Sequence, residues 1–99
     1  MQLIFEWDEN KARANLRKHQ VSFEEGKTIF NDPFLFTFAG ECHSEEEERF
    51  ISMGTSVANR ILIAVHTERE ETEDILVIRI INCRRATALE RQTYEEGKG

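Results

Sequence analysis

Two apolar segments, residues 60–67 and 75–82, constrain the fold of this chain most strongly. Both are rich in Ile and Val, and both are apolar at nearly consecutive positions. Central strands that are covered on both faces of a sheet have this pattern. We therefore expect the two segments to pair as an antiparallel hairpin, with the acidic segment 68–74 as its turn.

The start of the chain predicts a strand followed directly by a helix. Apolar and polar side chains largely alternate over residues 3–7, which favours a short strand with one strongly buried face. Asp8 is a suitable N-cap, because its carboxylate accepts hydrogen bonds from the free amides of a first turn. The predicted helix continues to His19 and presents Ala12, Leu16 and His19 on its inner face.

A second helix and two short strands are expected before the central hairpin. Ser22 and Glu25 form a Ser-x-x-Glu capping box, which opens a helix that continues to residue 30. The Asn-Asp-Pro sequence at residues 31–33 ends this helix. The aromatic segment 34–38 and the segment 49–54 then predict strands.

The last predicted element is a C-terminal helix that follows the capping box of Thr87 and Glu90 and ends before Gly97. The sequence therefore predicts one α+β domain over residues 1–99. Its central antiparallel sheet of about four strands is packed by two N-terminal helices and one C-terminal helix.

The net charge of −6 argues at first against nucleic-acid binding, because phosphate contacts need Lys and Arg. However, segment 41–48 holds five acidic residues and no Lys or Arg, and segment 68–74 holds five acidic residues and one Arg. The rest of the chain has 9 acidic and 12 basic residues. It is mildly basic, which is compatible with RNA binding.

No metal, cofactor or membrane segment is predicted. Cys42 and Cys83 lie far apart without a Cys-x-x-Cys pair, and His43 with the acids 45–48 crowds one loop with no second ligand pair elsewhere. No apolar run approaches the about 20 residues that cross a bilayer. The first residues also lack the pattern of a signal peptide, so we expect a cytoplasmic protein.

The strand 60–67 carries the first candidate for catalysis. Arg60, His66 and Glu68 stand at even positions and therefore share one face of the predicted sheet. Metal-free RNA cleavage needs a base for the 2′-hydroxyl, an acid for the leaving 5′-oxygen and a cation for the phosphate. His66 or Glu68 suits the base, although the same spacing also occurs where a strand simply ends at the surface.

Arginines near the second central strand are candidates for phosphate binding. Arg79 stands within a strand that we expect to be covered on both faces, so it needs a carboxylate partner or an opening into a cleft. Arg84 and Arg85 precede the cap at Thr87, where a helix N-terminus favours anions, and Arg91 follows one turn later. The alternative for these three is a solvated basic patch.

Short motifs spread in order over nearly the whole chain are shared with one known family. They are Phe5-Glu6-Trp7-Asp8 with Lys11, Asn15-Leu16-Arg17-Lys18-His19, Val21-Ser22-Phe23-Glu24-Glu25, Asp32-Pro33, His43-Ser44-Glu45, Glu48-Arg49, Gly54, His66-Thr67-Glu68-Arg69, Ile78-Arg79-Ile80-Ile81, Arg84-Arg85-Ala86-Thr87 and Glu90-Arg91 with Tyr94. Together they resemble the BrnT-type toxins, formerly a domain of unknown function.

The resemblance implies a fold like that of the RelE ribonucleases and a metal-independent RNA endonuclease activity that inhibits translation and growth. It also implies neutralisation by a BrnA-type antitoxin with a ribbon-helix-helix domain, through which alone the toxin would contact DNA. Residues predicted to take part in catalysis are Glu68, His66, Arg84, Lys11, His19 and Tyr94, and those predicted to bind RNA phosphates are Arg49, Arg60, Arg79, Arg84, Arg85 and Arg91.

Two positions depart from the family pattern. Gln20 stands where the family usually has Gly after His19, a position that needs a left-handed backbone. The segment 68–74 is longer and more acidic than the usual short Gly-Asp turn, and it would repel RNA near the predicted site. It would either weaken the activity or face the antitoxin.

Two other functions remain open from the sequence. The first is a non-catalytic module that only binds the antitoxin and modulates its DNA binding, which the net charge of −6 favours because it complements a basic repressor. The second is an enzyme that uses a metal ion held by His43 and the acids 45–48.

Overall fold

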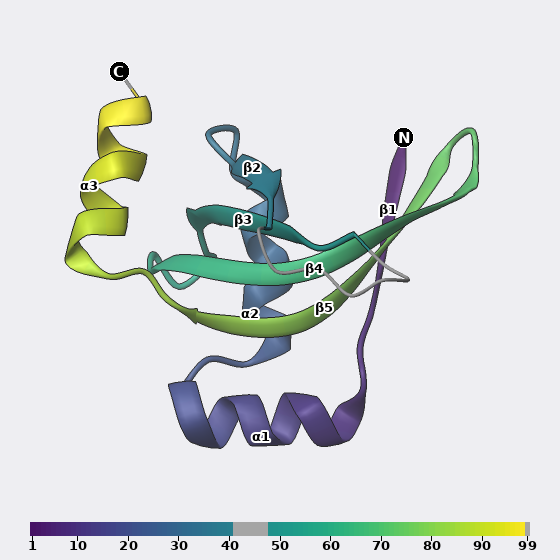
Figure 1. The fold of residues 1–99 in the computed structure, drawn as a ribbon, viewed down its shortest axis with the longest axis horizontal. Helices are drawn as coiled ribbons and strands as arrows, with labels where there is room; N and C mark the ends of the chain where they lie inside the picture. Colours follow the sequence, from purple (N-terminus) through teal and green to yellow (C-terminus); the bar gives the residue numbers. More distant parts are fainter. Residues whose placement is uncertain (41–47, 99) are drawn as a thin grey trace.

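The computed structural model describes residues 1–40 and 48–98 of the chain. Five strands form one sheet in the order β1-β5-β4-β3-β2, and helices pack against both of its faces (Figure 1). The elements are β1 (Gln2–Glu6), α1 (Glu9–His19), α2 (Phe23–Lys27), the short 3₁₀ helix η1 (Thr28–Asn31), β2 (Phe36–Ala39), β3 (Phe50–Thr55), β4 (Ile61–Thr72), β5 (Ile75–Arg85) and α3 (Ala88–Gly97). The predicted α+β class and its three α-helices are confirmed.

Strand β1 differs from the prediction. It pairs in parallel with β5, with Gln2 opposite Ile75 and Glu6 opposite Arg79, so the sheet has five strands and is mixed. Leu3 and Ile4 are both partly exposed, because β1 is an edge strand beside the projecting end of the β4–β5 hairpin (Figure 1). The expectations of an antiparallel sheet of about four strands and of a strongly buried face on this strand were therefore wrong.

The central hairpin is confirmed, but the acidic segment 68–74 is mostly strand. β4 continues to Thr72, with Glu68 opposite Ile78, and the turn itself consists of residues 73 and 74. The register shifts between Val65 and His66. Irregularities of this kind increase the local twist and turn side chains in new directions.

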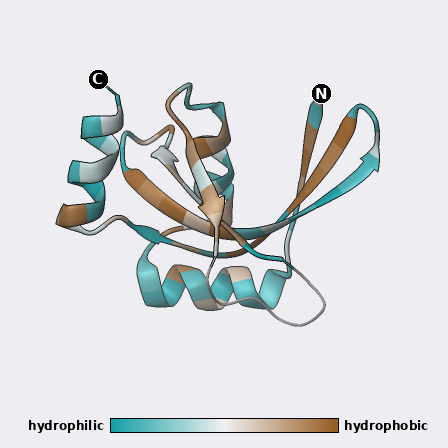
Figure 2. Ribbon diagram, turned by 45° about the horizontal axis from the view of Figure 1, so that its top comes forward, coloured by the Kyte–Doolittle hydropathy of each residue, from teal (hydrophilic) through white to brown (hydrophobic). Residues whose placement is uncertain are grey.

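The two faces of the sheet carry separate hydrophobic clusters. We call the face covered by α1, α2 and η1 the helical face, and the opposite one the α3 face. The cluster on the helical face consists of Val21, Phe23, Ile29, Leu62, Ala64, Ile78, Ile80 and Cys83. The smaller cluster on the α3 face consists of Met53, Ile63, Ala86 and Tyr94. Figure 2 shows the apolar strands between the polar outer sides of the helices.

Helix α1 begins as predicted, and Ala12 packs against the core as expected, but Leu16 does not belong to the inner face. Asp8 caps it by accepting from the Lys11 N–H at 3.0 Å. Leu16 is 48% exposed, whereas Asn15 is buried and donates to the carbonyl oxygens of Val21 and Cys83 at 2.9 and 2.8 Å. This amide joins α1 to β5, so a polar anchor holds the helix where a leucine contact was expected.

Gln20 ends α1 with φ 60° and ψ 30°, which confirms the expected left-handed backbone. Its N–H donates to the carbonyl oxygen of Leu16. The polypeptide therefore adopts at Gln20 the conformation that a glycine would adopt with less strain.

The two predicted capping boxes differ in the structure. The box of Thr87 and Glu90 is complete, and α3 extends through Gly97 rather than ending before it. Ser22 caps α2 by accepting from the Glu25 N–H at 3.0 Å. The Glu25 carboxylate, however, is hydrogen bonded to Arg60 and Ser56. It therefore joins α2 to the start of β4.

Candidate functional site

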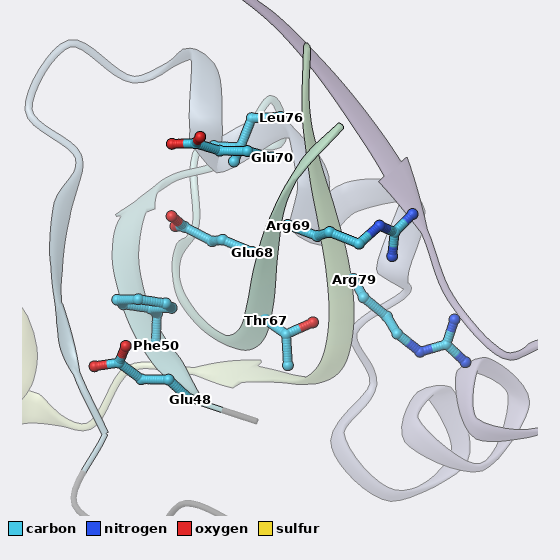
Figure 3. A pocket seen from close by; sticks show the side chains of 8 residues that line it. All are labelled: Glu48, Phe50, Thr67, Glu68, Arg69, Glu70, Leu76 and Arg79. Carbon is cyan, nitrogen blue, oxygen red and sulfur yellow. The ribbon is translucent and has the colours of Figure 1, made fainter. Parts of the chain in front are cut away.

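A cavity of about 480 Å³ opens beside the outer part of the β4–β5 hairpin. Its lining residues are Glu48, Phe50, Thr67, Glu68, Arg69, Glu70, Leu76 and Arg79. Figure 3 shows Glu68 and Glu70 pointing to one side of the hairpin and Arg69 and Arg79 to the other, as strand alternation requires. The side of the cavity next to Glu68 is therefore acidic.

Glu68 is the lining residue best suited to accept a proton. Its side chain is 28% exposed, so it is open to a ligand in the cavity while being partly desolvated. Burial raises the pKa of its carboxyl group, and the negative charge of Glu48 raises it further. A carboxylate with a raised pKa is a better general base near neutral pH.

His66 stacks on the lining residue Phe50 and is completely buried. Its ring packs edge-on against Phe30 and stacks on Phe50, with centroid distances of 5.1 and 6.0 Å. Burial lowers its pKa to about 4, and a hydrogen bond with the Thr67 backbone opposes this shift to a smaller extent. His66 is therefore a neutral imidazole at neutral pH. Its Nδ1 atom lies 3.8 Å from Oε2 of Glu68, so the structure brings these two predicted residues together.

Arg79 has the carboxylate partner that the sequence required, but it is not buried. It donates to Glu6 Oε2 at 3.0 Å, and its side chain is 41% exposed. Arg69 approaches the same carboxylate at 3.6 Å. The neighbouring Val77 and Ile78 are buried on opposite faces as expected, but the α3 face is open at Arg79, because α3 covers the other end of that face (Figure 1).

Lys11 lies in the first turn of α1, next to the cap residue Asp8. The pKa of Asp8 is lowered chiefly by the hydrogen bond from the Lys11 backbone, and the charges of Lys11 and Arg79 contribute to the same shift. Lys11 is exposed on α1, and Arg49 is half-buried next to the lining residue Phe50. Of the predicted residues, the cavity lining therefore includes Glu68 of β4 and Arg79 of β5, and Arg49 precedes the lining residue Phe50.

Arg84 and Arg85 do not form one anion site. Arg84 lies opposite Ile63 on the α3 face, whereas Arg85 lies opposite Leu62 on the helical face. Arg84 donates to both carboxylate oxygens of Glu90, at 2.8 and 3.0 Å. Consecutive residues in a strand point to opposite faces, which separates the predicted cluster.

Arg60 lies at the other end of β4, away from Glu68. It donates to both oxygens of Glu25, with Nε at 2.9 Å from Oε2, and it also contacts the carbonyl oxygen of Gln20 at 3.3 Å. The hydrogen bond from Arg60 is the main cause of the lowered pKa of Glu25. The pair joins β4 to α2.

Tyr94, which was predicted to assist catalysis, is buried in the smaller hydrophobic cluster on the α3 face. Its hydroxyl donates to Asp32 Oδ2 and lies 3.0 Å from Thr55 Oγ1. Asp32 Oδ2 also accepts from the Thr55 N–H at 2.7 Å. Tyr94 therefore fixes α3 to β3. His19, at the end of α1, and Arg91, exposed on α3, complete the predicted set.

The metal hypothesis involves residues that the structure does not describe. Cys42, His43 and the acids 45–47 lie outside residues 1–40 and 48–98. Within those two ranges, no three His, Cys, Asp or Glu side chains are grouped as metal ligands. In the same ranges, no helix is long and apolar enough to cross a membrane.

Sequence reasoning missed three residues around His66. Glu48 was considered for a site only as one of the acids 45–48 of the metal alternative, but it lines the cavity with Glu68. Phe50 stacks on His66, and Ser52 contacts it through a hydrogen bond. Alternation in the predicted strand 49–54 would have placed Phe50 and Ser52 on one face. Their pairing with β4 was the missing information.

Comparisons with known proteins agree with one another. A family model described as the ribonuclease toxin BrnT of type II toxin–antitoxin systems matches residues 7–90. The crystal structure of the Brucella abortus ribonuclease toxin BrnT superposes with a TM-score of 0.58 at 17% identity, covering 88% of this chain and 99% of that chain. At that identity the superposition supports the fold. No curated protein matches the sequence.

Proposed function

The chain belongs to the BrnT family of ribonuclease toxins of type II toxin–antitoxin systems, and from this we propose that it cleaves RNA, without a metal ion, at the cavity beside Glu68. Family membership implies an antitoxin partner. The single observation that supports this location is the Glu68 carboxylate, partly desolvated in a cavity of about 480 Å³. A general base needs this combination of access and raised pKa.

In the proposed reaction, Glu68 accepts the proton of a ribose 2′-hydroxyl. The 2′-oxygen then attacks the adjacent phosphorus, the bond to the 5′-oxygen breaks, and that oxygen takes a proton from water. Arg79, partly exposed on the other side of the hairpin (Figure 3), binds a neighbouring phosphate of the same RNA after exchanging Glu6 for it. The products are a 2′,3′-cyclic phosphate and a 5′-hydroxyl.

Cleavage of a defined RNA by the purified, antitoxin-free chain in excess EDTA tests this proposal. We expect new ends with 2′,3′-cyclic phosphate, and Glu68→Gln should lower the rate by about 10²- to 10⁴-fold. Glu71→Gln is the matched control, because Glu71 is exposed on the same strand and does not line the cavity. Wild-type cleavage by Glu68→Gln would refute the role of Glu68. Activity that EDTA abolishes would favour the metal hypothesis.

One observation favours the second candidate, a module that binds the antitoxin without cleaving RNA. Glu48, Glu68 and Glu70 line the same cavity, and three carboxylates repel phosphate while they attract a basic protein. Tight antitoxin binding by a folded chain that leaves RNA intact at high concentration, with and without ribosomes, would support this candidate over the enzyme.

We propose that the partner is a BrnA-type antitoxin with a ribbon-helix-helix domain, that both proteins act in the cytoplasm, and that this chain contacts DNA only through the antitoxin. The net charge of −6 suits binding to a basic repressor. Operator binding should require the antitoxin, which a gel-shift experiment with each protein alone and with the complex would test. Operator binding by this chain alone would contradict the proposal.

A further inference from the structure

We propose that His66 positions the carboxylate of Glu68 and that Ser52 and Thr37 anchor His66 for this purpose. The inference rests on the proposed function in that Glu68 is taken as the general base. It assigns a role to three residues of β2, β3 and β4 that neither contact the substrate nor line the cavity.

Three hydrogen-bonding groups form a continuous chain across these strands. Thr37 Oγ1 lies 2.7 Å from Ser52 Oγ, and Ser52 Oγ lies 2.7 Å from His66 Nε2. Ser52 and His66 are completely buried. Thr37 is paired with Ser52 in the sheet and is exposed at the edge strand β2. The chain therefore leads from the edge of the sheet to the imidazole.

The other ring nitrogen of His66 lies on the side of Glu68. Nδ1 is buried and lies 3.8 Å from Glu68 Oε2. The backbone of Thr67 approaches the ring, but Nδ1 makes no hydrogen bond of ordinary geometry among the described residues. A buried polar atom without a partner is costly. A small rotation of the partly exposed Glu68 side chain would shorten this distance to a hydrogen bond. Catalytic hydrogen bonds are often long before a substrate binds.

The direction of the hydrogen bonds follows from the charge of Glu68. If Nδ1 carries the proton, Thr37 donates to Ser52, Ser52 donates to Nε2, and the Nδ1–H faces the carboxylate. If Nε2 carries the proton, a nitrogen lone pair faces the carboxylate instead and repels it. The Nδ1–H tautomer is therefore favoured, and it turns His66 into a neutral donor toward Glu68.

Other charged groups around Glu68 do not supply this contact. Glu48, before β3, and Glu70, on β4, line the same cavity and repel the Glu68 carboxylate. Arg69 and Arg79 point to the opposite side of the hairpin and interact with Glu6 (Figure 3). A donor at His66 Nδ1 would therefore oppose the effect of the neighbouring carboxylates on Glu68.

Two isosteric replacements of His66 separate positioning from packing. The amide nitrogen of Asn reaches the place of Nδ1, whereas that of Gln reaches the place of Nε2. We expect the pKa of Glu68, followed by carboxyl ¹³C NMR, to stay near the wild-type value in His66→Asn and to rise by about 1 unit in His66→Gln. Ser52→Ala should move the titration in the same direction as His66→Gln. Equal titrations in the Asn and Gln variants would overturn the proposal.

¹⁵N NMR of the wild-type imidazole gives a test that needs no variant. The expected result is a neutral His66 with its proton on Nδ1, and a proton on Nε2 would overturn the inference. Both NMR measurements are made without RNA, so their failure overturns the positioning role alone. Full cleavage activity of Glu68→Gln would instead overturn the role of Glu68 as general base, and intact RNA with the wild-type chain would overturn the proposed function.

Discussion

Arg84 connects the end of β5 to the first turn of α3 through two hydrogen bonds to Glu90, 2.8 and 3.0 Å long. The same carboxylate accepts from the Thr87 N–H at 2.8 Å and so completes the capping box. These contacts, above all the hydrogen bond from Arg84, lower the pKa of Glu90 to about 2 from 4.5. One carboxylate therefore caps α3 and joins it to the sheet.

We expect Glu90→Gln to lower the free energy of unfolding at pH 7 by about 1 kcal/mol, because it weakens the ion pair and the cap. The pKa of Glu90 is lower in the folded state, so its contribution is complete above about pH 4.5 and is lost as the pH falls toward 2. Urea denaturation of both proteins at several pH values measures this. Glu96→Gln, exposed on the same helix, is the control. A difference that stays constant down to pH 2 would contradict the prediction.

The buried His66 predicts that the free energy of unfolding also depends on pH in a second range, above that of Glu90. Burial lowers its pKa to about 4 from 6.5, so the unfolded chain binds a proton in this range and the folded chain does not. Stability should therefore fall between pH 6.5 and pH 4, by on the order of 3 kcal/mol. The measurement is the slope of unfolding free energy against pH. His66→Asn should remove this component, and His19→Asn should retain it.

Local signals in the sequence predicted the elements, and pairing between distant strands decided the rest. The Asp8 and Thr87 caps and the central hairpin were predicted because each depends on neighbouring residues. The parallel pairing of β1 with β5 joins segments about 70 residues apart, and no local pattern marks it. The mixed sheet was therefore not predictable from periodicity.

In the candidate site, too, local patterns predicted some features, and the others depend on pairing between distant strands. His66 and Glu68 were predicted to share a face because the strand period is two residues. The same period separates Arg84 from Arg85, although they were interpreted as one cluster. The positions of Phe50 and Ser52 against His66 depend on the register of β3 with β4. Sequence alone did not provide that register.

Gln20→Gly should stabilise the protein by about 1 kcal/mol, because Gln20 has φ 60° and glycine adopts this conformation without the steric cost of a Cβ. Asn59→Gly is a matched comparison, since Asn59 has φ 61° and asparagine tolerates the left-handed region better than glutamine. We expect a smaller gain there. Thermal and urea denaturation of both variants provide the measurement. A destabilised Gln20→Gly variant would contradict the argument.

The contact between Gly26 and Cys83 allows a test of how tightly α2 packs against β5. A Cβ at Gly26 would overlap Sγ of Cys83, whose side chain is completely buried. Burial raises the pKa of this thiol to about 12, so it remains protonated and the conflict is steric. Gly26→Ala should therefore cost about 1–3 kcal/mol of stability.

Cys83→Ala removes the atom that Gly26→Ala would overlap, so the two substitutions should compensate each other. Cys83→Ala alone leaves a small cavity and should be mildly destabilising. The double variant should be more stable than the sum of the two single effects predicts, by about 1 kcal/mol or more. Urea denaturation of the wild type and the three variants gives this coupling energy. Additive effects would mean that α2 shifts to accept the methyl group and that the contact with Cys83 does not set the distance between α2 and β5.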